Sequence, residues 1–168
     1  MKKLTSILLA IVILSLTLSF SSCEMTSEED LKFFPQPSGI YVTGCTSDLM
    51  YMIIPETYEG EKVVGITLSA FRGSVSLKKV IISDSVTEIG NFAFADCTSL
   101  KKVKIPDSVT EIGIGAFSGC ISLRKIVFEG TKREWASMSK SSNYTDIPED
   151  AVVVCSDGSL YLVDNTPV

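Results

Sequence analysis

The sequence predicts a β-rich solenoid, a short stack of 23-residue units with a capping hairpin at each end and one short C-terminal helix. Two observations carry the prediction. One unit is written twice, over residues 82–104 and 105–127, with 14 identical positions. A more divergent copy precedes these two in the same register, and β-rich runs flank all three. Because a unit of this length buries its apolar face only against its neighbours, the period indicates a solenoid.

Residues 1–22 have the form of an export signal. Met1-Lys2-Lys3 is basic, the run from Leu4 to Leu18 is apolar apart from scattered Ser and Thr, and small residues follow. The apolar run is short for a membrane-spanning helix, which needs roughly 20 residues. A retained membrane anchor is therefore only the alternative.

Cys23 ends a run, Leu18 to Cys23, that resembles the lipobox of bacterial lipoproteins, with Phe20 in place of the usual leucine. The resemblance implies cleavage before Cys23, a diacylglyceryl group on its thiol and often an acyl group on the new amino terminus. Two or three chains anchor a protein stably, whereas one holds only marginally. Ordinary cleavage near Ser22, with Cys23 unmodified, is the alternative.

Residues 23–38 are expected to be an acidic, proline-containing tether. Four acids in the seven residues 24–30 cannot pack a core, and Pro35 and Pro37 stiffen the chain that follows. The run Ser27-Glu28-Glu29-Asp30 resembles the signal that sends lipoproteins of some Gram-negative anaerobes to the outer face of the outer membrane. A solvated tether is the other reading of this run.

The folded domain is expected to span residues 39–163, ahead of a tail at 164–168. We expect caps at 39–62 and 132–163 and repeats at about 63–85, 86–108 and 109–131. In the first cap, β-rich runs at 39–44 and 49–55 are expected to form a hairpin.

Within a repeat, the apolar positions predict two walls joined by a turn. Equivalent side chains should stack about 4.8 Å apart along the solenoid. We expect Gly90 and Gly113 to supply backbone freedom at the bend. The inward residues are expected to be Leu100, Val103, Ile105, Leu123, Ile126 and Phe128 on one wall and Val86 and Ile89 on the other, with ladders of Phe71, Phe94 and Phe117 and of Leu77, Leu100 and Leu123.

The C-terminal segment is expected to close the stack. A short helix over 132–138 should place Trp135 against the last coil, as a capping residue rather than a ligand platform. Residues 152–155 and 160–163 should then pair across Ser156-Asp157-Gly158-Ser159, a hairpin signature, and shield the exposed edge of the sheet.

The cysteines of the domain are expected to be unbridged. Cys97 and Cys120 occupy the same repeat position and lie within disulfide range, but the divergent unit has Ser74 there. We therefore favour two packed thiols over a bridge. Cys45 and Cys155 should lie at opposite ends of the stack, too far apart to be joined.

The repeat pattern I-P-x-S-V-T-x-I-G-x-x-A-F-x-x-C-x-S-L-x-x-V resembles that of the BspA-type leucine-rich repeat family of bacterial surface proteins. Residues 53–58 resemble the family's opening unit, and residues 130–135 and 154–158 resemble its closing unit, so the likeness covers roughly 39–162. The resemblance implies a leucine-rich repeat stack. Its functional content is small, because some members are adhesins and most have no assigned ligand.

Composition argues against several classes of function. The chain has no histidine, Gly-rich phosphate loop or zinc-type cysteine cluster, so we expect no catalytic residues, no metal and no cofactor. The carboxylates repeated at Glu88 and Glu111 are expected to be a solvated coil face. Removal of residues 1–22 takes away Lys2 and Lys3 and leaves a net charge of −7, which argues against nucleic acid as a partner.

One surface pattern suggests binding. Lys79, Lys102 and Lys125 are equivalent by repeat, and Lys104 should share their outward face. Such a basic stripe suits an anionic glycan or an acidic protein segment, although a solvated strand face is the simpler reading.

The function we expect is a non-enzymatic lipoprotein of the outer membrane, exposed on the cell surface, which binds host or neighbouring-cell protein or glycan. The alternative is a structural accessory subunit of an outer-membrane or periplasmic assembly.

Overall fold

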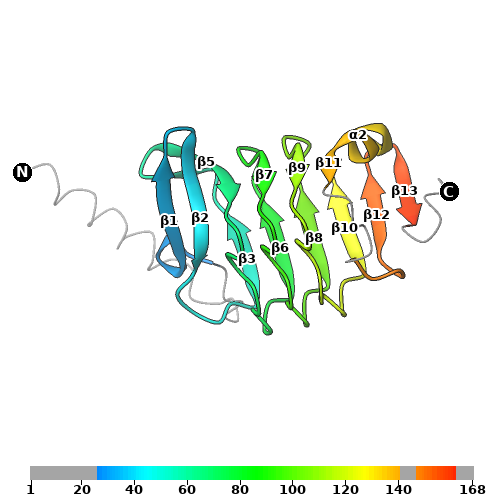
Figure 1. The fold of residues 1–168 in the computed structure, drawn as a ribbon, viewed down its shortest axis with the longest axis horizontal. Helices are drawn as coiled ribbons and strands as arrows, with labels where there is room; N and C mark the ends of the chain where they lie inside the picture. The colour runs from blue at the N-terminus through cyan, green and yellow to red at the C-terminus, as the bar shows by residue number, and fades with distance from the viewer. Residues whose placement is uncertain (1–25, 141–146, 162–168) are drawn as a thin grey trace, which may run out of the picture.

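The computed structural model describes residues 26–140 and 147–161, which form a solenoid that winds between two β-sheets. Figure 1 shows the strands side by side along the long axis, with β1 and β13 at opposite ends of the stack. Sheet A has the order β13-β12-β10-β8-β6-β3, and sheet B has the order β1-β2-β5-β7-β9-β11, with β4 paired to β5. The predicted β-rich solenoid is confirmed.

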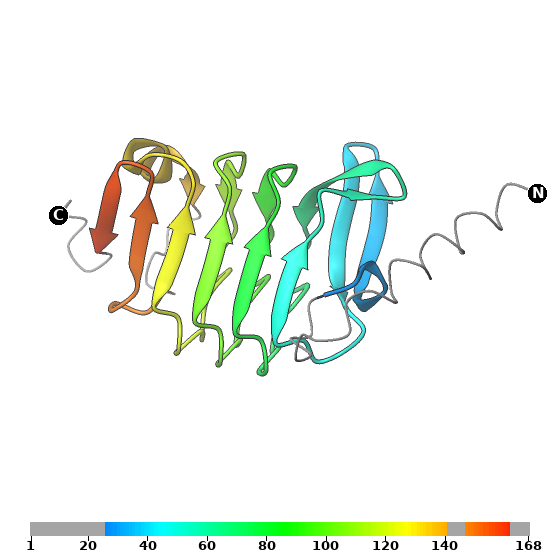
Figure 2. The ribbon, with the colours of Figure 1, turned by 180° about the vertical axis from the view of Figure 1, so that it is seen from behind.

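The strands of sheet A are short and parallel, apart from the last. They are β3 (Tyr51–Ile54), β6 (Lys79–Ile82), β8 (Lys102–Ile105), β10 (Lys125–Phe128), β12 (Val152–Cys155) and the antiparallel β13 (Gly158–Tyr161). Figure 2, from behind, shows these strands aligned. Alternate residues are buried, as in β8, where Val103 and Ile105 face the core.

Sheet B forms the opposite wall. Its strands are β1 (Leu31–Gln36), β2 (Gly39–Cys45), β5 (Glu61–Ile66), β7 (Glu88–Ile89), β9 (Glu111–Ile112) and β11 (Ser139–Lys140), with β4 (Thr57–Tyr58) beside β5. The 23-residue step joins Lys79 to Lys102 and Lys102 to Lys125. The step from Tyr51 to Lys79 is longer, because the β4–β5 hairpin lies within it.

The core consists of side-chain ladders that run along the stack, as predicted. The rings of Phe71, Phe94 and Phe117 are stacked, with centroids 5.3 and 5.6 Å apart. Leu77, Leu100 and Leu123 are fully buried, each two residues before a sheet A strand begins. Each coil therefore contributes one residue to each ladder, and a coil alone would expose them all.

The N-terminal cap differs from the prediction. Residues 39–44 and 49–55 do not pair with each other, because β2 joins sheet B and β3 joins sheet A. The N-terminal hairpin is β1–β2 instead, so its first strand lies in the segment 23–38 that we expected to be a tether.

Two apolar side chains explain why this acidic segment folds. Leu31 is only 6% exposed, and the ring of Phe33 stacks on Tyr58 with centroids 3.9 Å apart. Pro35 is tolerated because β1 is the edge strand of its sheet. Because charged residues and prolines surround Leu31 and Phe33, the alternation of buried and exposed residues in β1 was not recognised in the sequence.

The C-terminal cap follows the prediction closely. Helix α2 (Lys132–Ser137) is capped by Thr131, whose hydroxyl accepts a hydrogen bond from the Glu134 backbone N–H. Trp135 is 2% exposed and its ring packs on Phe128, which makes it a capping residue. The predicted hairpin is present, but its second strand begins at Gly158, so the turn is tighter than expected. Residues 162–163 lie outside the described residues.

Gly90 and Gly113 are required for a reason other than the one expected. Neither has a positive φ. A Cβ at Gly90 would lie 2.6 Å from the carbonyl carbon of Thr67, and one at Gly113 would lie 2.5 Å from the backbone nitrogen of Asn91. These glycines allow adjacent coils to approach each other, and their flexibility is not what the turn uses.

Candidate functional site

The predicted lysines lie on the outer face of sheet A. Lys79, Lys102 and Lys125 are paired across β6, β8 and β10, one per strand. Lys104 lies two residues further along β8, between Ile81 and Val127 of the adjoining strands. All four are at least partly exposed, while the residues between them point into the core.

A second basic column, which the sequence reading missed, runs beside the first. Lys78, Lys101 and Arg124 immediately precede the three strand lysines. In each coil the two consecutive N–H groups point at one carbonyl of the preceding coil, as when Lys101 and Lys102 donate to Lys78 O at 2.9 and 3.3 Å. This bulge-like pairing leaves both side chains outside the core. The same 23-residue offset in the sequence was the signal that would have revealed it.

We call these six residues the basic grid: Lys78, Lys79, Lys101, Lys102, Arg124 and Lys125. Arg124 pairs with Asp150 at 3.0 Å at one margin of the grid. Beside the grid, Lys104 pairs with Glu129 at 2.8 Å, and that hydrogen bond raises the pKa of Lys104. The other five residues of the grid form no ion pair with any described residue. Their charges are therefore open to a ligand.

The opposite wall carries the other sign of charge. Glu88 and Glu111 pair in register across β7 and β9, on the outer face of sheet B. The basic and acidic ladders thus lie on different faces of one acidic chain. This separation concentrates positive potential at the grid.

Two cysteines lie in the core in an equivalent place in successive coils. The thiols of Cys97 and Cys120 donate to the carbonyls of Phe71 and Phe94 at 3.2 and 3.0 Å. They are not bridged, as predicted. The hydrogen bond with Cys97, together with burial, raises the pKa of the Cys120 thiol, so it is a packing group rather than a nucleophile. Cys45 on β2 and Cys155 on β12 lie at opposite ends and are not joined to each other.

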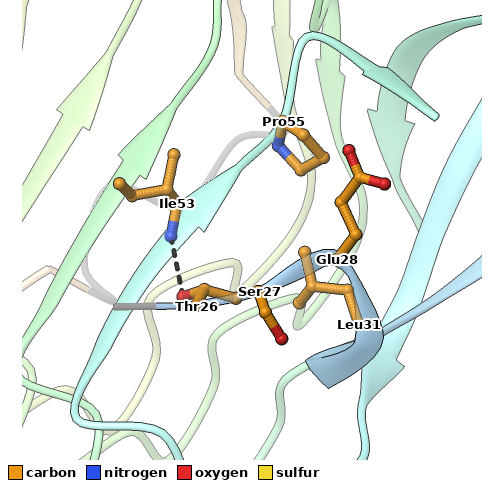
Figure 3. A pocket seen from close by; sticks show the side chains of 6 residues that line it. All are labelled: Thr26, Ser27, Glu28, Leu31, Ile53 and Pro55. Carbon is orange, nitrogen blue, oxygen red and sulfur yellow. Dashed lines mark hydrogen bonds between the residues drawn. The ribbon is translucent and has the colours of Figure 1, made fainter. Parts of the chain in front are cut away.

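A small pocket of about 110 Å³ lies at the N-terminal end of sheet A, as Figure 3 shows. The Thr26 hydroxyl donates to Tyr51 O at 2.8 Å and accepts from Ile53 N at 3.1 Å, so it occupies the open edge of β3. Ser27 and Asp30 close the 3-10 turn η1 (Glu28–Asp30), and the backbone hydrogen bond from Ser27 lowers the pKa of Asp30. The polar groups of Thr26, Ser27 and Asp30 therefore hold the N-terminal segment in place against β3.

Other chemistry finds little support. Within residues 26–140 and 147–161, no cluster of three or more His, Cys, Asp or Glu side chains is placed to hold a metal ion. Over the same residues, no helix has the length and apolar character needed to cross a membrane. Cys23 lies outside the described residues.

Comparison with known proteins gives a family match over most of the chain. Residues 46–155 match the profile of a family described as the BspA type leucine-rich repeat region, in six copies. The match extends on both sides beyond the three repeats expected from the sequence. None of the curated proteins matches the chain.

Several solved bacterial structures are similar. A leucine-rich repeat protein from T. pallidum is 25% identical, with a TM-score of 0.61, over 79% of this chain and 65% of its own. One from Bacteroides capillosus is 27% identical, with a TM-score of 0.64, over 78% and 97%. A leucine-rich cell surface protein from Faecalibacterium prausnitzii is 26% identical, with a TM-score of 0.54, over 80% and 39%. The chain thus spans less than two thirds of the first and third of these proteins.

Proposed function

The chain belongs to the family of BspA-type leucine-rich repeat proteins, whose solenoid is a protein-interaction module. From this premise we propose that it is a non-enzymatic, lipid-anchored surface protein. Its repeat face would bind protein or glycan of a host or a neighbouring cell. The observation that carries the proposal is the basic grid, which repeats with the coils on an outer face.

Two features support the surface location. The run that ends at Cys23 resembles a lipobox, and the similar protein from Faecalibacterium prausnitzii is described as a cell surface protein. Proteolysis of intact cells tests the location: release of peptides from 39–163, with an acylated Cys23 peptide left on the cells, is the expected result. Protection of the domain until lysis would contradict a surface location.

Binding is tested with the full chain extracted in mild detergent. We expect it to bind at least one immobilised extracellular-matrix protein or surface glycan, with an affinity that falls as salt rises. The triple variant Lys79→Ser, Lys102→Ser, Lys125→Ser should bind about tenfold more weakly, because three exposed charge contacts are lost. Wild-type binding by this variant would move the interaction surface away from the grid.

A further inference from the structure

We infer that the basic grid binds a linear anionic glycan, with a sulfate or carboxylate on successive sugars, laid across β6, β8 and β10 along the stack. The inference rests on the proposed function, since it names the ligand class for the same surface. It depends on the spacing of the charges, on the two-column arrangement and on the shape of the face.

The spacing of the grid selects among anionic polymers. The three positions in each column belong to adjacent paired strands, which lie about 4.8 Å apart. One sugar of an extended 1→4-linked chain advances by a similar distance. An extended acidic peptide presents side chains on one face only at every second residue, about 6.7 Å apart. A glycan with one charge per sugar therefore stays in step with successive coils, and a peptide does not.

The two columns provide charge on both sides of such a chain. Because Lys101 and Lys102 are consecutive and both lie outside the core, each coil offers two cations side by side. A chain that lies between the columns meets a cation on either side at each step. Substituents that alternate between the two sides of a sugar chain are then matched equally well.

Among the described residues, most of the outward side chains around the grid are cationic rather than apolar. The pocket described above lies at the N-terminal end, lined by residues such as Thr26, Ile53 and Pro55, and none of the grid residues lines it. Between the grid lysines the apolar side chains point inward, as Val80 and Val103 show with 0% exposure. Specific protein interfaces are centred on large aromatic or apolar anchors. The outward apolar side chains described next to the grid, Ile81 and Val127, are only partly exposed and flank Lys104. A surface on which cations predominate suits an anionic glycan.

The margins of the grid define its extent. Tyr51 and Val152 continue the first column on β3 and β12, so the charged part covers three coils. Arg124 is held by Asp150 at the C-terminal margin. Three coils accommodate a short oligosaccharide of three or four sugars, and longer chains would engage several copies of the protein at once.

The test measures binding of size-defined heparin oligosaccharides, chemically desulfated heparin and poly-L-glutamate to the full chain, by calorimetry at two salt concentrations. The grid variant is Lys79→Ser, Lys102→Ser, Lys125→Ser. A matched variant, Lys32→Ser, Lys62→Ser, Arg133→Ser, makes the same change in net charge at exposed positions outside the grid. Circular dichroism and thermal unfolding confirm that both variants are folded.

The inference expects the sulfated oligosaccharide to bind more tightly than poly-L-glutamate, with a loss of about tenfold in the grid variant only. Equal losses in both variants would attribute binding to net charge and overturn the inference. Preference for poly-L-glutamate would overturn the glycan but leave the grid as a protein-binding surface, as the proposed function requires. If none of the probes binds while a matrix protein still binds through the grid, the glycan inference is also overturned and the proposed function stands.

Discussion

The turns of the three coils share a left-handed backbone whatever residue occupies it. Ser69, Phe92 and Gly115 are equivalent by repeat, with φ of 55°, 54° and 60°. Four residues on, the equivalent Gly73, Asp96 and Gly119 have φ of 75°, 60° and 71°. Glycine takes this conformation without cost and other residues do not. The coil therefore dictates the backbone, and individual residues tolerate it.

Phe94 is expected to be among the most sensitive positions, because its ring stacks on Phe71 and Phe117 and is fully buried. Phe94→Ala should lower the free energy of unfolding by about 3–5 kcal/mol, and Phe94→Leu by less. The control is Phe92→Ala, since Phe92 is 38% exposed and carries a strained φ. Urea unfolding measures all three. Equal losses at positions 92 and 94 would contradict the ladder.

Cys120 should make stability fall in alkaline solution. Its pKa is raised in the folded state, by the hydrogen bond with Cys97 and by burial, while an unfolded thiol ionises near its ordinary value of 9.0. The unfolded state then loses its proton first, so the contribution is intact below pH 9 and declines above it. The decline is up to about 1.4 kcal/mol per pH unit.

The same hydrogen bond lowers the pKa of the Cys97 thiol, so comparison with Cys120→Ser separates the effect of the Cys97–Cys120 pair from titrating lysines and tyrosines. The serine hydroxyl can still donate to Phe94 O, and Ser74 occupies the equivalent place in the preceding coil. Urea unfolding from pH 7 to 10.5 should show the two proteins diverging above pH 9. Parallel curves would mean that Cys120 ionises equally in both states.

At the scale of the element, the side chains between neighbouring coils determine how closely the backbones of those coils can approach. Gly90 and Gly73 separate two effects, because Gly90 has an ordinary φ and a crowded neighbourhood, whereas Gly73 has a φ of +75° and open space. Gly90→Ala forces the backbone of the preceding coil to move. Gly73→Ala only strains its own residue.

We therefore expect Gly73→Ala to lower the free energy of unfolding by about 1–2 kcal/mol, the cost of a left-handed alanine. Gly90→Ala should cost more, since neighbouring backbone atoms have no rotamer through which to yield. Thermal and urea unfolding rank the two variants. The reverse order would indicate that turn conformation limits the stack more than coil spacing does.

The elements with a repeated signal were predictable from the sequence, and those without it were not. The strands after Leu77, Leu100 and Leu123 could be placed because three copies report the same alternation. Strand β1 has a single copy, and its two inward residues, Leu31 and Phe33, are surrounded by charge and proline. Strand β3 was recognised as a strand, but nothing local indicates which sheet it joins.

At the scale of the whole molecule, stability should be divisible by coil. Deletion of residues 86–108 joins Ser85 to Val109, the residue equivalent to Val86, so every ladder is preserved with one fewer member. We expect a folded, shorter solenoid with a lower thermal midpoint, measured by calorimetry. Deletion of 86–97 alone breaks the register and should prevent folding. Similar behaviour of the two deletions would contradict the repeat boundaries.

The candidate site was predictable in part for the same reason. The column at Lys79, Lys102 and Lys125 follows from the repeat together with the alternation of a strand. The neighbouring column did not, because alternation places Lys78 and Lys101 on the inner face. Only the shared carbonyl at the start of each strand brings them outside. The 23-residue recurrence marks these basic residues in the sequence, but their outward placement follows only from the bulge.

The hydrogen bonds that join Thr26 to β3 also limit how far Cys23 can lie from the solenoid. Thr26 is three residues after Cys23, and three residues span at most about 11 Å when fully extended. If Cys23 carries an acyl group, this short segment would keep the first coil close to the lipid surface. The distance that the grid extends from the membrane would then be determined by the number of coils below it.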